Sequence, residues 1–315
     1  MVKYRLKKKY KIIFSILLIL IIGTISYFYI TYRLSNEYKF KELGYKEQDV
    51  EYLLTFDETF QTKLIEMGKD EEVLMLLKQK YFIQKNFDRY LDYKKKNRTD
   101  EDLTLEEVVA KVNINRDREY YEKPQKTDVN KGNLILVNKY YHLEEDFVPK
   151  NIEKASNWYA YEGILVSKES YEAFIEMFNA AKEEKLNLIL NSGYRSYKEQ
   201  FDVYKEFDQN YGEEYADNYA ARAVFSEHQT GLAYDIVSPG ATGEDFEKTK
   251  EFKWLEKNAH KFGFILRYPK GKEEYTGFKY ESWHYRYVGE ETARIIKKEG
   301  ITFDEYYAFY IENKK

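Results

Sequence analysis

Imidazole and thiolate groups, which often bind catalytic metals, are scarce in this chain, because it contains four histidines and no cysteine. Two of the histidines lie close to acidic residues: Asp235 follows His228 by seven positions, and Glu281 precedes His284 by three. Asp235 lies within the apolar run 232–237, which is typical of a buried strand. A carboxylate is costly to bury there unless a cation satisfies it. That cation could be an arginine or a metal ion.

Two imidazoles and one carboxylate are the protein ligands of a catalytic zinc site, which keeps a fourth position for water. The metal would lower the pKa of that water and polarise a carbonyl group. Glu281 would be the general base, which takes a proton from the water and passes it to the leaving amine. Residues three apart on a flat strand point to opposite faces, so the hypothesis requires a bend or bulge between Glu281 and His284. Taken alone, each histidine is more often a packed residue than a ligand.

Arg195 is a further candidate, because it follows a predicted strand and precedes a predicted helix. Ser196 and Glu199 form a capping-box pattern, so a helix is expected directly after Arg195. Its guanidinium and the free N–H groups of the helix start could bind a carboxylate. The alternative for Arg195 is a surface salt bridge. Gln200 and Ser226 could supply neutral hydrogen bonds to the same substrate.

The other two histidines, His142 and His260, are interpreted as structural residues. The first precedes an acidic run, and the second lies next to a helix stripe. The chain contains no Ser-x-x-Lys motif, which argues against the serine acyl-enzyme route of penicillin-binding proteins. It also contains no Gly-x-Ser-x-Gly, no His-Glu-x-x-His and no glycine-rich phosphate loop.

Short strands and amphipathic helices are expected to position these residues. Apolar runs predict strands at 134–137, 186–190, 232–237, 264–268 and 279–288. Apolar residues at helical spacing predict helices at 171–181 and 252–262, the second ending at Gly263. Helices segregated from short strands with tight turns indicate an α+β domain.

The composition supports a folded chain of 315 residues, about two domains in length. Hydrophobic residues make up 43% and aromatic residues 18%, far more than a disordered chain carries. The net charge is −4, but residues 1–11 hold six basic residues and no acid, so the remainder carries −10. This charge argues against a nucleic-acid binder, although a local basic groove would still be compatible with it. The absence of cysteine excludes disulfides and thiolate zinc sites but does not decide the compartment.

A membrane segment is predicted near the N-terminus. Residues 12–30 contain no charge, and at 1.5 Å per residue they span about 28 Å, close to the thickness of the hydrocarbon core. The basic residues of 1–11 predict a cytoplasmic tail, with the rest of the chain outside. A cleaved secretory signal and a buried core helix are the alternatives.

Residues 31–128 are rich in charge, with apolar residues at helical spacing, which predicts a helical spacer, or stalk, outside the membrane. A partner-binding module that places the rest of the protein is a compatible interpretation. The stretch 124–127 mixes helix breakers and charges, so we place the start of the next domain, 129–315, directly after it.

Several segments together resemble one protein family. SGYRSYKEQ, SEHQTGLAYDI, GFILRYPKGKEEYTGF and ESWHYRYVG, with LVNKYY near residue 140, resemble the VanY-type D-alanyl-D-alanine carboxypeptidases. This family of zinc peptidases also includes VanX-type dipeptidases and L,D-carboxypeptidases, and the similarity covers about residues 130–290. It implies that His228, Asp235 and His284 bind zinc. It also implies that Glu281 is the catalytic base and that Arg195 binds the terminal carboxylate of the substrate.

The resemblance also implies the fold and marks two departures. Gln200 and Ser226 match positions that contact substrate in similar enzymes. The implied fold is a small α+β domain whose antiparallel sheet has helices packed on one side. Ala223 and Val224 stand where Pro-Gly is expected, and Ser282 stands where proline is usual. These departures concern loops next to ligands and bear on the shape of the pocket.

We therefore expect a membrane-anchored, zinc-dependent D-alanyl-D-alanine carboxypeptidase with its catalytic domain, residues 129–315, outside the cell. It would remove the terminal D-alanine of peptidoglycan stem peptides by attack of a metal-activated water. An L,D-carboxypeptidase acting on tetrapeptide stems is the first alternative. A catalytically idle cell-wall-binding protein that has kept the fold is the second.

Overall fold

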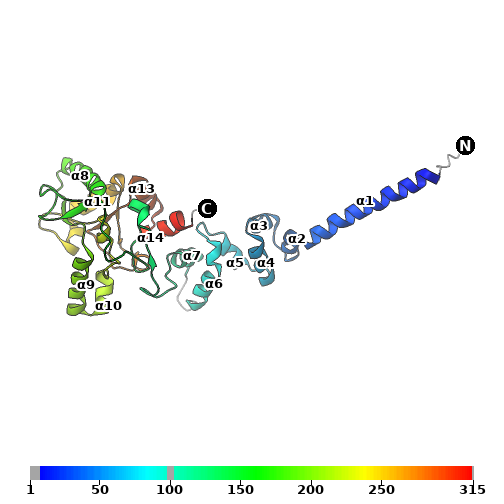
Figure 1. Ribbon diagram of the computed structural model, residues 1–315, viewed down its shortest axis with the longest axis horizontal. Coiled ribbons are helices and arrows are strands. Elements are labelled where there is room, and N and C mark those ends of the chain that lie inside the picture. Colours follow the sequence, from blue (N-terminus) through cyan, green and yellow to red (C-terminus); the bar gives the residue numbers. More distant parts are fainter. Residues whose placement is uncertain (1–7, 98–102, 314–315) are drawn as a thin grey trace. The chain divides into compact units, whose positions relative to one another are not determined.

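The computed structural model describes residues 8–97 and 103–313 (Figure 1). The chain divides into two compact units, Met1–Phe87 and Asp88–Lys315. The second unit begins upstream of residue 129, where the sequence predicts the start of the catalytic domain. The domain limits themselves stay predictions.

The first unit contains one long apolar helix, α1 (Lys8–Leu34), none of whose residues is buried. Within the described residues it is the one helix long and apolar enough to cross a membrane. Four short helices follow: α2 (Asn36–Glu42), α3 (Glu47–Leu53), α4 (Glu58–Met67) and α5 (Glu71–Leu77), with the turn η1 (Gln84–Asn86) after them. The side chains of Ser35, Asp57 and Asp70 cap α2, α4 and α5. The helical character predicted here is confirmed, and the role as a spacer stays a prediction.

Helices and small sheets alternate in the second unit. Its α-helices are α6 (Phe87–Lys96, which starts at the division), α7 (Leu105–Asn113), α8 (Lys168–Glu183), α9 (Tyr197–Tyr211), α10 (Glu213–Tyr219), α11 (Lys250–Asn258), α12 (Glu273–Thr276), α13 (Glu290–Glu299) and α14 (Phe303–Tyr306). Its single-turn or irregular helices are η2 (Val129–Leu134), η3 (Glu227–Thr230), η4 (Gly243–Lys248), η5 (Ala259–Phe262) and η6 (Tyr307–Glu312). The helices predicted around 171–181 and 252–262 are present as α8 and as α11 with η5, and Gly263 ends the latter.

A four-stranded antiparallel sheet positions the candidate site. Its order is β5 (Ile189–Ser192), β6 (Ala233–Val237), β8 (His284–Tyr287) and β7 (Phe264–Leu266). Two smaller sheets pair β1 (Gln125–Lys126) with β2 (Tyr141–His142), and β3 (Ile152–Lys154) with β4 (Leu165–Ser167). The mixture of helices and small sheets confirms the predicted α+β class.

Four predicted strands are wrong in whole or in part. The strand predicted at 186–190 begins only at Ile189, as β5, and the strand predicted at 264–268 ends at Leu266, as β7. Residues 135–137 are buried but form no strand. The Arg286 guanidinium donates hydrogen bonds to the backbone carbonyls of Asn133 and Ile135, at 3.0 and 2.7 Å. These hydrogen bonds replace those that a neighbouring strand would make. The strand predicted at 279–288 is shortened to β8, because a turn at Ser282 and Trp283 precedes it.

The two faces of the sheet have different neighbours. Tyr234 and Tyr285 are cross-strand partners on one face, and they pack in the main core with Phe174 of α8 and Leu255 of α11. The next pair along, Asp235 and His284, points to the opposite face because side chains alternate along a strand. A second cluster joins β7 to α13 and α14. The expectation that the helices pack on one side is not confirmed.

Candidate metal centre and active site

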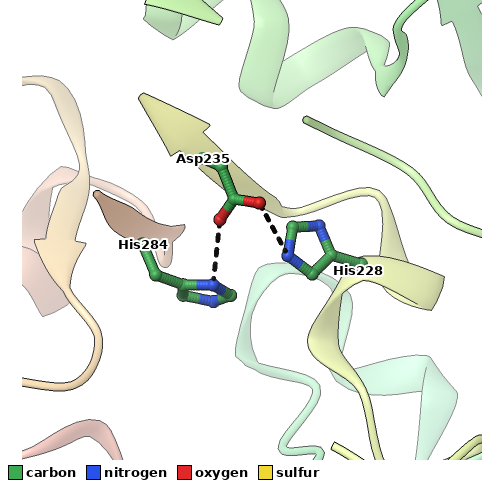
Figure 2. A group of neighbouring side chains, drawn as sticks. All are labelled: His228, Asp235 and His284. Atoms are coloured by element: carbon green, nitrogen blue, oxygen red, sulfur yellow. Dashed lines mark ion pairs between the residues drawn. The ribbon is translucent and has the colours of Figure 1, made fainter. Parts of the chain in front are cut away.

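Three candidate ligands converge from three separate elements (Figure 2). Asp235 on β6 and His284 on β8 face each other directly across the sheet. His228 lies in the single turn η3, which ends at Gly231 just before β6. Gly231 has a φ of 70°, and a Cβ there would lie 2.8 Å from the Cδ1 atom of Ile152. Glycine therefore permits the sharp return from η3 into β6 that brings His228 back over Asp235.

The spacing of the ligand atoms suits one shared metal ion. One atom each from His228, Asp235 and His284 lie within 4.8 Å of one another. Asp235 Oδ2 lies 3.6 Å from His228 Nε2, and Asp235 Oδ1 lies 3.3 Å from His284 Nδ1 (Figure 2). Ligand atoms bound about 2.0–2.2 Å from a tetrahedral zinc ion lie roughly 3.3–3.6 Å apart. The three residues predicted from the sequence are thus brought together with a separation that a zinc ion would bridge.

Outer contacts orient both imidazoles. The Nδ1–H group of His228 donates to the backbone carbonyl of Gly193 at 2.7 Å, which leaves the Nε2 lone pair facing Asp235. His284 Nε2 faces Glu227 Oε2 at 3.7 Å, which leaves Nδ1 facing Asp235. Such partners set the tautomer of metal-binding histidines. Among the described residues, Asp235 Oδ1 is buried without a hydrogen-bond partner, as expected where a cation would complete the group.

The electrostatics of the group favour a cation. Burial opposes the Asp235 carboxylate, but the two imidazoles outweigh it and hold the pKa of Asp235 well below its usual range. Burial also opposes a charged His284, yet the carboxylates of Asp235, Glu227 and Glu281 raise the pKa of His284 to about 9. The carboxylates that attract a proton to this ring would attract a divalent cation equally well. The donor set and its charge therefore fit zinc.

Glu281 lies beside the three candidate ligands. The turn at Ser282 and Trp283 supplies the predicted bend, so Glu281 and His284 face the same point. Glu281 Oε2 lies 3.5 Å from His284 Nδ1, the atom that also faces Asp235. Its side chain is 12% exposed, and burial raises the pKa of Glu281 to about 7. A carboxyl group with such a pKa can accept and release a proton near neutral pH.

Arg195 extends over the same group from the start of α9. The Ser196 capping box predicted from the sequence begins that helix. The Arg195 guanidinium lies 3.8 Å from Asp235 Oδ2 and donates to Ser192 Oγ at 3.1 Å and to Gln200 Oε1 at 2.7 Å. Its side chain remains 22% exposed, so part of the guanidinium still faces solvent. The structure therefore places Arg195 at the candidate site, on the surface of a cavity.

Gln200 and Ser226 are both buried and contact other site residues. Gln200 accepts from Arg195 and donates to the carbonyl of Ala221 at 2.6 Å. Ser226 Oγ accepts from the backbone N–H of His228 at 3.4 Å. These contacts position Arg195 and His228. Direct contact of either residue with a substrate stays a prediction.

A cavity of about 190 Å³, here called the active-site cavity, joins these residues. It is lined by the three candidate ligands and by Arg195, Gln200, Val203, Phe207, Tyr219, Ala220, Ala221, Ser226, Glu227, Tyr268, Phe278, Glu281 and Trp283. A larger cavity of about 340 Å³ between α11, η5, β7 and α13 contains none of the candidate ligands. His142 and His260 also lie outside the ligand group.

The sequence reasoning missed a buried ion-pair network behind His284, formed by Glu227, Arg267, Arg286 and Asp304. Glu227 Oε1 lies 2.7 Å from Arg267 Nε and 2.9 Å from Arg286 Nη1. Arg267 Nη1 lies 2.6 Å from Asp304 Oδ2. Burial opposes the Glu227 carboxylate, but the two guanidiniums hold its pKa below the usual range. The available signals for this network were the position of Glu227 directly before His228 and the presence of Arg267 and Arg286 within segments that resemble the family.

The family model of D-alanyl-D-alanine carboxypeptidase, VanY, matches residues 163–290. The D-alanyl-D-alanine carboxypeptidase of Enterococcus faecium is 40% identical over 195 residues, which cover 59% of this chain and 61% of that protein. The chain spans less than two thirds of the length of the curated relatives that are 40% identical to it.

Solved structures agree with the sequence comparison. The LdcB LD-carboxypeptidase is 36% identical with a TM-score of 0.55, over 59% of this chain and 90% of that chain. The D,D-pentapeptidase VanY of a VanB-type resistance cassette, solved as a mutant in complex with Zn(II), is 33% identical with a TM-score of 0.50. That match covers 55% of this chain and 98% of that chain. The chain described here therefore belongs to the VanY family of D-alanyl-D-alanine carboxypeptidases.

Proposed function

We propose that this chain is a zinc-dependent D-alanyl-D-alanine carboxypeptidase that removes the terminal D-alanine from peptidoglycan stem peptides. The observation that carries the proposal is the convergence of His228, Asp235 and His284 beside the buried carboxyl group of Glu281. Relatives named as D-alanyl-D-alanine carboxypeptidases, and one solved with Zn(II), support it.

The three ligands would hold zinc through His228 Nε2, an Asp235 carboxylate oxygen and His284 Nδ1. Bound zinc would polarise the scissile carbonyl and lower the pKa of a water molecule. Gly193 and Glu227 act on the other ring nitrogens and keep the two lone pairs turned towards Asp235. The site is therefore already arranged for the ion.

Glu281 would move the proton. Its Oε2 atom accepts a proton from the attacking water and then delivers it to the nitrogen of the leaving D-alanine. Burial favours the neutral carboxyl group and raises the pKa of Glu281 to about 7, so neither step is far uphill near neutral pH. The turn before β8 fixes this carboxyl group beside the ligand atoms.

Arg195 would bind the C-terminal carboxylate of the substrate. Gln200 and Ser192 accept hydrogen bonds from the guanidinium and hold it at the cavity wall, and part of it remains exposed. A charge-assisted pair of this kind discriminates a free C-terminus from an internal peptide bond. That requirement separates a carboxypeptidase from an endopeptidase.

An L,D-carboxypeptidase is the second candidate, because the LdcB LD-carboxypeptidase has a TM-score of 0.55 with 36% identity. Both activities would present a terminal D-alanine to Arg195. They differ in the residue before it, which is D-alanine in a pentapeptide stem and the third stem residue in a tetrapeptide.

The anchor and spacer are further parts of the proposal. The length and composition of α1 support a single membrane-spanning anchor. The basic residues that precede it favour a cytoplasmic N-terminus and a catalytic domain outside the cell. The helices within 31–128 would then separate the membrane from the catalytic domain.

The experiment incubates the full chain, in detergent and with bound zinc, with penta- and tetrapeptide stems, and identifies the products by mass spectrometry. Release of D-alanine from the pentapeptide, abolished by a chelator and restored by zinc, is the expected result. Release from the tetrapeptide alone would favour the L,D activity. No release from either peptide by the metal-loaded protein would favour the idle wall-binding alternative.

A Glu281→Gln variant tests the base. It should lose about 10²–10⁴-fold in kcat while it still binds stoichiometric zinc, because the amide keeps the shape but cannot accept the proton. Full activity in this variant would exclude Glu281 from the proton transfer.

A further inference from the structure

Helices α9 and α10 form a hairpin that projects from the rest of the second unit (Figure 1). Four aromatic residues pack against one another along it, and we call them the aromatic ladder: Phe207, Tyr211, Tyr215 and Tyr219. The ring centroids of Tyr211 and Tyr215 are 4.8 Å apart, and those of Tyr215 and Tyr219 are 4.3 Å apart with an angle of 22° between the rings. Phe207 stacks on Tyr215 at 6.5 Å and 17°.

The aromatic ladder is exposed although its members could pack inside a core. Tyr211 is 63% exposed, Tyr215 is 40% and Tyr219 is 36%. The contacts between the rings thus leave much of these three tyrosines exposed to solvent. A contiguous exposed apolar patch of this kind marks an interaction site.

The aromatic ladder is also continuous with the active-site cavity. Phe207 and Tyr219 line that cavity, whereas Tyr215 and Tyr211 continue the stack outwards along the hairpin. If one end of a molecule is bound in the cavity, the part that extends out of the cavity would therefore contact these rings. The ladder is placed to hold the part of a large substrate that lies next to the scissile bond.

The charge of the hairpin restricts the class of ligand. Residues 197–219 contain seven carboxylates and two lysines. Arg222 forms ion pairs with two of these carboxylates, Glu213 and Asp217, and an excess of negative charge remains. Such a surface repels polyanions, which include nucleic acids, anionic lipid surfaces and phosphate-rich polymers. It leaves uncharged polymers as the suitable occupants of a row of exposed rings.

We propose that the aromatic ladder binds the sugar rings of the glycan strand from which the stem peptide projects. The inference rests on the proposed function, because it assigns a second binding surface to the same substrate. The glycan consists of N-acetylated sugar rings, and its lactyl carboxyl groups are consumed in the amide bonds to the stems. It is therefore an uncharged polymer of rings wherever it carries peptides.

Sugar rings also suit the faces of the aromatic ladder. An aromatic face carries negative charge density, and the axial C–H bonds of a pyranose ring present weakly positive hydrogens to it. Exposed tyrosine hydroxyls can donate to, or accept from, sugar hydroxyls at the rim of the same ring. The aromatic ladder would thus recognise the shape of the glycan, and the active-site cavity would recognise the peptide.

The test compares wild type with a Tyr211→Ala/Tyr215→Ala variant, which leaves both cavity-lining members of the ladder intact. A Trp158→Ala/Tyr161→Ala variant is the matched control, since these two aromatics are 67% and 45% exposed outside the ladder. The full zinc-loaded chain is used in a detergent without sugar headgroups, because a sugar headgroup would compete for the rings.

Calorimetric titration with peptide-free N-acetylated glycan oligosaccharides measures binding without turnover. We expect the ladder variant to bind at least about tenfold more weakly than wild type and than the control variant, since each lost stacking contact reduces the binding free energy. Equal binding by all three proteins, or no binding by wild type, would overturn the proposal.

Hydrolysis supplies the second measurement. Wild type should cleave a glycan-linked pentapeptide with a higher kcat/KM than the free pentapeptide, and the ladder variant should lose that preference while it cleaves the free peptide normally. An equal loss on both substrates would overturn the proposal, because the rings would then only shape the cavity.

Ladder-dependent glycan binding by a protein that cleaves neither substrate would support the ladder and refute the proposed function. A dimer in sedimentation that the ladder variant abolishes would assign the rings to a second copy and overturn the proposal.

Discussion

Val224 lies in a backbone conformation that its side chain disfavours. Its φ is 64°, in the left-handed region, and its carbonyl accepts a hydrogen bond from the N–H group of Leu143 at 2.9 Å. A β-branched residue held there costs about 1–3 kcal/mol. The family resemblance leads one to expect glycine at this position, and glycine adopts this φ without steric cost. A Val224→Gly substitution should therefore stabilise the second unit.

The expected gain is the difference between two terms. Relief of the left-handed conformation contributes about 2 kcal/mol, the middle of the range for such a residue. The greater conformational freedom of glycine in the unfolded chain reduces this gain in the free energy of unfolding by about 0.5–1 kcal/mol. We expect a net gain of about 1 kcal/mol, or roughly 2–4 °C in Tm for a unit of this size.

Tryptophan fluorescence during urea unfolding measures the effect, because all three tryptophans of the chain lie in the second unit. Val224→Ala should recover only part of the gain, since alanine removes the branch but keeps Cβ. Val148→Gly is the matched control: this valine is 60% exposed and has a negative φ, so glycine should destabilise there by about 0.5–1 kcal/mol. A Val224→Gly protein destabilised as much as Val148→Gly would refute the reasoning.

Two further predictions concern the site. Arg195→Ala should reduce transition-state stabilisation by about 2 kcal/mol on a peptide with a free C-terminus. This corresponds to a roughly 30-fold lower kcat/KM. It should have little effect on the same peptide amidated, and an equal loss on both peptides would contradict the carboxylate role. Glu227→Gln should weaken zinc binding by about 10–100-fold, as measured by competition with a chromophoric chelator, because His284 loses its charged outer partner. Asp304→Asn removes a carboxylate of the same buried ion-pair network that does not face His284, so it should weaken zinc binding less than Glu227→Gln does.

Much of the candidate site could be predicted, because local sequence patterns indicate its residues. Asp235 stood out as a carboxylate in an apolar run, and the strand around it is β6. The capping box after Arg195 predicted where α9 begins. The need for a bend between Glu281 and His284 followed from strand geometry, and a turn is present there. Each of these inferences used residues within ten positions of one another.

The missed features depend on contacts between distant parts of the chain. The apolar run 134–137 looks like a strand, but the carbonyl of Ile135 accepts a hydrogen bond from Arg286, some 150 residues later. Asp304 joins the buried ion-pair network from beyond the region that resembles the family. Periodicity and spacing carry no information about which distant guanidinium meets which carboxylate.

The buried ion-pair network explains how so much negative charge can surround one histidine. Its two guanidiniums balance its two carboxylates, so Glu227 can face His284 without adding net charge to the site. Asp235 and Glu281 are then the carboxylates left to compensate a dication, and Arg195 lies 3.8 Å from the first of them. Loss of a network carboxylate would leave a guanidinium uncompensated behind His284, and breaking a buried pair of this kind costs about 3–5 kcal/mol. The network therefore supports the candidate metal site through both the orientation of His284 and the local charge.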